Sequence, residues 1–112
     1  MEKRRYALAL DLVDDPKAIE AYKKAHRKVW PEVIASIKDA GIVEMEIFLR
    51  GSRLFMLMEV DESFSFENKA RMDAQNPKVQ QWERLMEQYQ QIVPAAAKGE
   101  KWSLMESIFK LN

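Results

Sequence analysis

The fold is decided by the stretch IVEMEIFLRGSRLFMLMEV, residues 42–60. Residues 42–49 and 54–60 are rich in residues that favour strands, and the tetrapeptide between them contains Gly51, which is typical of a tight turn. The stretch therefore predicts a β-hairpin. Large apolar residues fall on both faces of its strands, for example Met45, Ile47, Phe55 and Leu57.

Further strands are predicted near the two ends of the chain. From Arg5 to Val13, apolar residues recur at every second position, which is the period of a strand with one face on a core. Residues 102–111 are expected to form the last strand, with apolar residues on both of its faces. The apolar positions include Tyr6, Leu8, Leu10 and Leu12 in the first strand and Met105, Phe109 and Leu111 in the last.

Helices are predicted before and after the hairpin. Asp15 followed by Pro16 is typical of a helix start, and this helix is expected to reach about residue 29. Trp30-Pro31 favours a break, after which a second helical segment should run to residue 40 and stop at Gly41. Beyond the hairpin, residues 64–73 and 76–91 predict two more helical stretches.

This order of elements is typical of a ferredoxin-like βαββαβ fold of the α+β class, in which helices cover one face of an antiparallel sheet. We expect a single domain spanning residues 1–112, since the length is typical of one domain. The other face of the sheet carries apolar residues and needs a cover. A homodimer packed sheet on sheet is the expected solution, and a monomer that uses this face as a ligand pocket is the alternative.

The composition argues against several classes of function. Lys plus Arg and Asp plus Glu each number 18, so no net charge attracts nucleic acid or an anionic membrane. The chain has no cysteine and one histidine, so we expect neither a disulfide nor a metal site. The N-terminal stretch up to Asp11 is too short and too polar for a signal peptide or a membrane span, which favours a cytoplasmic protein.

Tyr22 and His26 share one face of the first predicted helix, because they are four residues apart. An imidazole can donate or accept a proton near neutral pH, and a phenol can hydrogen-bond a ligand hydroxyl. A lone histidine on an apolar stripe is, however, more often a structural residue, so the spacing alone leaves both interpretations open. Trp82 lies at helical spacing from Leu85 and Met86, which by itself indicates a core residue.

A resemblance favours the functional interpretation. The segment YKKAHRKVWPE, residues 22–32, resembles the Y-x-x-x-H-x-x-x-W-P-E signature of the L-rhamnose mutarotase family. The similarity extends through the hairpin, the helix around Trp82 and the C-terminal residues 106–109. It implies a dimeric α+β barrel that interconverts the α and β anomers of a 6-deoxy-L-hexose without a cofactor or a metal.

The resemblance also implies roles for individual residues. His26 corresponds to the family's proton donor and Tyr22 to its sugar-contacting tyrosine. Trp82 matches the first of two pocket tryptophans, Glu83 stands in place of the second, and Met45 stands in place of a pocket tyrosine. Family members assigned to L-fucose are more similar around residues 43–46 and 99–102, which favours L-fucose over L-rhamnose.

Two other functions fit the same predicted fold. It hosts cofactor-independent monooxygenases and haem-degrading enzymes, in which His26 would serve as a base or an iron ligand. A non-catalytic ligand-binding dimer would instead keep His26 as a core residue.

Overall fold

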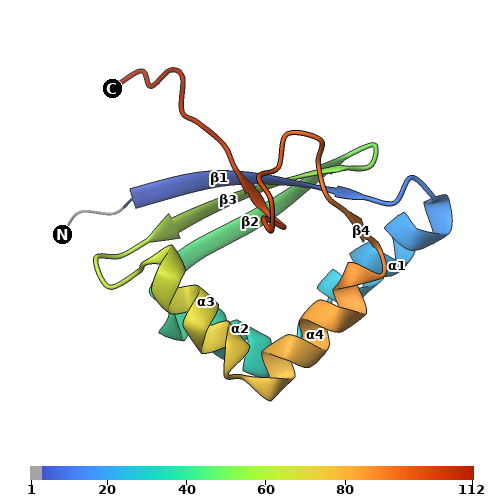
Figure 1. The fold of residues 1–112 in the computed structure, drawn as a ribbon, viewed down its shortest axis with the longest axis horizontal. Helices are drawn as coiled ribbons and strands as arrows, with labels where there is room; N and C mark the ends of the chain where they lie inside the picture. Colours follow the sequence, from blue (N-terminus) through green and yellow to red (C-terminus); the bar gives the residue numbers. More distant parts are fainter. Residues whose placement is uncertain (1–3) are drawn as a thin grey trace.

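Within residues 4–112, which the computed structural model describes, the chain forms one antiparallel sheet of five strands and four helices (Figure 1). The strands are β1 (Arg4–Leu12), β2 (Ile42–Arg50), β3 (Arg53–Val60), β4 (Gln90–Gln91) and β5 (Ser103–Leu104). The helices are α1 (Pro16–His26), α2 (Pro31–Asp39), α3 (Phe66–Ala74) and α4 (Pro77–Glu87). The sheet order is β2-β3-β1-β4, with β5 also on β1, and the helices lie on one side of it (Figure 1). The predicted α+β class is confirmed.

The β2–β3 hairpin forms as predicted, with a glycine at each end of β2. Gly51 adopts a φ of +60° in the turn, and Gly41 adopts a φ of +96° just before β2. A Cβ atom on Gly41 would lie 2.6 Å from the Ser63 Oγ, so a side chain at this position would clash as well as strain the backbone. Gly41 therefore allows the sharp turn by which the chain enters β2, and Gly51 allows the reversal from β2 into β3.

The first helix begins at the predicted cap, but the first and the last helix end earlier than predicted. The Asp15 carboxylate accepts the Lys17 N–H at 3.1 Å at the start of α1. α1 ends at His26 and not at residue 29. Trp30, the residue before Pro31, has an extended ψ of 137°, so the helix must end before this residue. α4 ends at Glu87 and not at residue 91, because residues 90–91 pair with β1.

The third predicted helix begins two residues late. Ser65 is the N-cap of α3 and its hydroxyl accepts the Asn68 N–H at 3.0 Å. Phe64, the expected first residue, is only 3% exposed and packs in the core ahead of the helix. Burial of this aromatic ring therefore sets the start of the helix.

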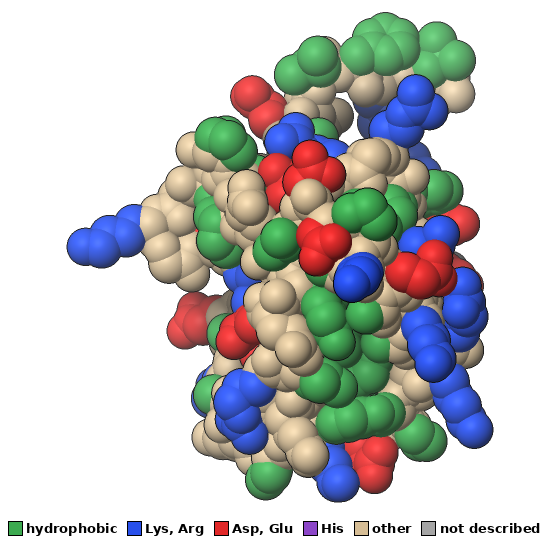
Figure 2. All heavy atoms as spheres, turned by 90° about the vertical axis from the view of Figure 1, so that its right-hand side faces the viewer, with side chains coloured by type: hydrophobic (Ala, Val, Ile, Leu, Met, Phe, Trp, Pro, Cys, Tyr) green, Lys and Arg blue, Asp and Glu red, His purple; other side chains and the backbone are tan. Residues whose placement is uncertain are grey.

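The predicted strand over residues 102–111 is wrong for most of its length. Only Ser103 and Leu104 pair with β1, and the last bond of this ladder joins the Met105 N–H to the Ala7 carbonyl at 2.8 Å. Residues 105–112 then leave the sheet on the side away from the helices (Figure 1), and hydrophobic side chains gather on the arm at the top of the molecule (Figure 2). A strand needs a partner for its backbone, and these residues find none within the described chain. Three apolar residues of the arm are highly exposed: Ile108, Phe109 and Leu111.

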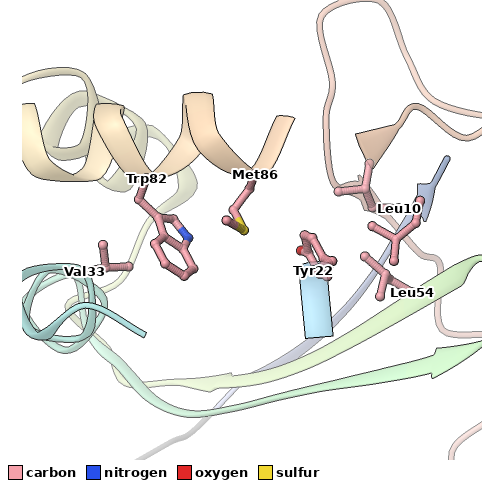
Figure 3. Close-up of a cluster of buried hydrophobic side chains, with 7 residues drawn as sticks. Leu10, Tyr22, Val33, Leu54, Trp82 and Met86 are labelled. Atoms are coloured by element: carbon pink, nitrogen blue, oxygen red, sulfur yellow. The ribbon is translucent and has the colours of Figure 1, made fainter. Parts of the chain in front are cut away.

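The core lies between the helices and one face of the sheet. Alternate residues of β1 and β3 point towards the helices, and side chains from α1, α2 and α4 meet them there (Figure 3). One buried cluster comprises Leu10, Leu12, Tyr22, Val33, Leu54, Trp82 and Met86, and a second comprises Leu8, Ile42, Met56, Met58, Val60 and Phe64.

No helix within residues 4–112 is long and apolar enough to cross a bilayer.

Candidate active site

A cavity of about 330 Å³ lies between the end of α1 and the β2–β3 hairpin. Small-molecule sites usually have volumes of roughly 300–1,000 Å³, so the cavity has room for a compact ligand such as a monosaccharide. One wall is polar and comes from α1, and the other is apolar and comes from the hairpin. The lining residues are Tyr22, Lys23, His26, Arg27, Ile47, Leu49 and Leu54.

The imidazole of His26 is oriented by its own helix. Its Nδ1 atom lies 2.9 Å from the backbone carbonyl oxygen of Tyr22. Because a carbonyl oxygen can only accept, Nδ1 must carry a hydrogen in this contact. The other ring nitrogen, Nε2, is then the one available to take up and release a proton.

Two aromatic rings hold the imidazole in place. The Tyr22 ring lies 4.3 Å from it between centroids, tilted by 33°, and the Trp82 ring lies 5.5 Å away, edge to face at 71°. Trp82 in turn makes an edge contact with Trp30 at 5.2 Å. This packing restricts rotation of the imidazole.

Tyr22 is 4% exposed and contributes to both the core and the cavity wall. Burial raises the pKa of its phenol, and a hydrogen bond from the Gln90 amide, at 3.4 Å, partly offsets this rise. The phenol is therefore uncharged at neutral pH and acts there through hydrogen bonds.

Trp82 packs against the imidazole of His26. It is 8% exposed, lies behind the imidazole and is not on the wall of the cavity. The structure thus brings Tyr22, His26 and Trp82 together from α1 and α4, but only the first two border the cavity.

Met45 and Glu83 are not on the wall of this cavity. Met45 is on the same face of β2 as Ile47, which does line it, but Met45 packs against the second core cluster. Glu83 lies in a group of charged side chains from α3, α4 and the loop before β5. Burial raises the pKa of its carboxyl most, while Lys101 opposes the rise and Asp73 adds to it.

Besides the apolar wall, three polar residues near the site were not predicted from the sequence. Lys23 and Arg27 border the cavity, and both lie within 4.0 Å of the Glu20 carboxylate. Lys23 and Arg27 are four residues apart and so share a helix face, but this face is turned by about 100° from that of Tyr22 and His26, so helical spacing gave no signal for them. Gln90 gave no signal either, because residues 76–91 were expected to be a single helix. Within residues 4–112, no three His, Asp or Glu side chains gather as metal ligands would.

Comparison with known proteins identifies the family. A family model described as L-rhamnose mutarotase matches residues 5–111. The chain belongs to the L-rhamnose mutarotase family. Mutarotases are carbohydrate isomerases that interconvert sugar anomers, so the protein is an enzyme of this class. The family resemblance predicted from residues 22–32 is thereby confirmed.

Two individual mutarotases support the assignment, and one more distant structure supports the fold. The chain is 46% identical to the L-fucose mutarotase of Xanthomonas campestris pv. campestris over 114 residues, which cover 100% of this chain and 91% of that protein. The crystal structure of an L-rhamnose mutarotase from Formosa agariphila matches with a TM-score of 0.72 and 26% identity, covering 97% of this chain and 99% of that one. A dimeric ferredoxin-like protein from an uncultured marine organism has a TM-score of 0.57 at 14% identity, covering 96% and 91%, which supports the fold alone.

Proposed function

We propose that this mutarotase interconverts the α and β anomers of L-fucose, with His26 as the proton-transfer group. The observation that carries the proposal is the imidazole on the cavity wall, whose Nδ1 hydrogen is bound to the Tyr22 carbonyl so that Nε2 remains free. The choice of sugar rests on similarity, since the L-fucose mutarotase is 46% identical to this chain and the L-rhamnose mutarotase structure 26%.

The reaction requires one proton to leave the anomeric hydroxyl and one to reach the ring oxygen. In the proposed mechanism Nε2 of His26 accepts the first proton, and the resulting imidazolium donates a proton to the ring oxygen as the C1–O5 bond breaks. The open-chain aldehyde rotates about C1–C2 and closes from the other face by the reverse transfers. One imidazole serves both transfers, and general acid–base catalysis of this kind contributes about 10²- to 10⁴-fold.

The two walls of the cavity suit the two sides of a 6-deoxy sugar. Ile47, Leu49 and Leu54 offer apolar surface to the C–H face and the methyl group, while the Tyr22 hydroxyl is suited to a sugar hydroxyl. Trp82 supports the imidazole from behind. Sugar contacts by Met45, Trp82 and Glu83 stay predictions, which a ligand-bound structure would test.

We further propose that the protein acts as a homodimer. The sheet face away from the helices, here called the open face, carries the Phe48 and Phe55 rings 5.9 Å apart, and Phe48 is 46% exposed. The apolar arm of residues 105–112 is exposed on the same side of the sheet (Figure 1). A second copy would cover both surfaces, and exposed apolar patches of this kind are typical of protein interfaces.

Exchange NMR tests the proposed reaction directly. The purified protein is added to equilibrated L-fucose, L-rhamnose and a panel of D-hexoses, and magnetisation transfer between the two anomeric protons is measured. We expect the fastest catalysed exchange with L-fucose. Exchange at the uncatalysed rate for every deoxyhexose would overturn the proposal, and binding without exchange would instead indicate a non-catalytic sugar-binding protein.

A further inference from the structure

The Tyr22 hydroxyl is joined to a residue from a distant part of the chain. The Nε2 atom of Gln90 donates to the Tyr22 Oη at 3.4 Å, across 68 residues of sequence. Gln90 is carried on β4 opposite Leu12 of β1, and the Val13 N–H donates to the Tyr89 carbonyl at 2.8 Å beside it. The amide is therefore mounted on backbone that the sheet holds, next to a phenol that borders the cavity.

Core packing does not explain an amide at this position. Within the described residues, the Oε1 atom of Gln90 is buried without a hydrogen-bond partner. Rotating the amide by 180° does not remove the mismatch. Oε1 would then accept from the Tyr22 hydroxyl, but the amide N–H groups would be buried without a partner where Oε1 now lies. A leucine or methionine would fill the same space without burying an unmatched polar atom, which is costly.

The direction of the bond determines what the phenol can do. Since Gln90 donates to the Tyr22 oxygen, that oxygen acts as an acceptor and the phenol's own hydrogen remains to be donated elsewhere. A hydrogen bond received by the oxygen also polarises the O–H bond and makes it a better donor. A sugar hydroxyl oxygen in the cavity is an acceptor that this hydrogen can meet.

We propose that Gln90 is a positioning residue for sugar binding: its amide donates to the Tyr22 oxygen and so directs the phenol hydrogen to a hydroxyl of the bound sugar. The inference rests on the proposed function of the cavity as a sugar site. Gln90 itself acts through Tyr22 and does not border the cavity.

Two substitutions of Gln90 test this, together with Tyr22→Phe. Gln90→Glu has nearly the same shape but only accepts near neutral pH, so it captures the phenol hydrogen, and Gln90→Met removes the amide. We expect each to raise the dissociation constant for L-fucose by about threefold to tenfold, the equivalent of one hydrogen bond. Neither should weaken binding further when Tyr22 is already Phe. Gln91→Met, at the exposed neighbouring position, is the matched control and should leave the dissociation constant unchanged.

The ¹³Cζ resonance of Tyr22, assigned by its loss in Tyr22→Phe, reports the bond without any reaction. We expect it to shift in ligand-free Gln90→Met and Gln90→Glu protein but not in Gln91→Met. An unmoved resonance, unchanged L-fucose affinity, or weakening that adds in full to that of Tyr22→Phe would overturn the inference. Wild-type protein that binds L-fucose without exchanging its anomers would overturn the proposed reaction alone, since neither readout depends on turnover.

Discussion

The two faces of the sheet are built from the same strands but meet different surroundings. On the face towards the helices, Leu10, Leu54 and Val60 are no more than 2% exposed. On the open face, β2 and β3 present Phe48, Phe55 and Leu57 together with several glutamates. A depression of about 490 Å³ lies beside these residues. Because side chains alternate along a strand, one sequence supplies a finished core on one side and an uncovered surface on the other. This contrast underlies the two proposals, in which the sugar site lies on the covered side and self-association uses the open face.

The largest effect should come from the covered face. His26→Ala is expected to lower the catalysed anomer-exchange rate by about 10²- to 10⁴-fold while keeping the fold, because it removes the proposed proton carrier. Exchange NMR measures the rate and circular dichroism checks the fold. Lys24→Ala, at an exposed position on the same helix, is the control. An unchanged rate in His26→Ala would remove this residue from the mechanism.

A pair of leucine truncations should separate the two faces by stability. Leu10→Ala is expected to lower the free energy of unfolding by about 2–5 kcal/mol, because it opens a hole in a fully covered core. Leu57→Ala, on the open face, should cost less, and its cost should grow with protein concentration as the dimer forms. Urea denaturation at two protein concentrations measures both. Equal, concentration-independent losses would contradict the distinction between the faces.

A charge on the open face should dissociate the proposed dimer. Phe48→Glu is expected to weaken self-association by about tenfold or more, since it places a carboxylate in an apolar contact. Sedimentation velocity over a range of concentrations measures the effect. Ile34→Glu is a matched control, because Ile34 is an apolar residue of similar exposure, 41%, on α2. If Ile34→Glu dissociates the dimer and Phe48→Glu does not, the interface lies on the helices.

The smallest effect concerns Glu83, whose carboxyl has a raised pKa in the folded protein, chiefly because of burial. A raised folded pKa means that stability is complete below the pKa of the unfolded carboxyl and declines as pH rises above it. Glu83→Gln should therefore raise Tm slightly at pH 7 and leave it unchanged near pH 3. Calorimetry at the two pH values measures this, with exposed Glu32→Gln as the control. A lower Tm at pH 7 would show that attraction to Lys101 outweighs burial.

Local patterns predicted most of the fold because they depend on near neighbours. The hairpin, the strand β1 and the cap at Asp15 all follow from residues a few positions apart. The failures share another cause. Residues 90–91 look helical by themselves, and residues 105–111 look extended. The conformation that each segment adopts depends on whether it can pair with the backbone of β1, which residues 90–91 do and residues 105–111 do not.

For the active site, the sequence by itself determined that Tyr22 and His26 share a helix face, because the α-helix repeats every 3.6 residues. Only the tertiary structure decided that Trp82 packs behind the imidazole, that Gln90 reaches the phenol, and that Met45 and Glu83 lie off the cavity wall. Helical periodicity fixes which way a side chain points, whereas its partner depends on how distant elements pack, and this information is not contained in any short stretch of the chain.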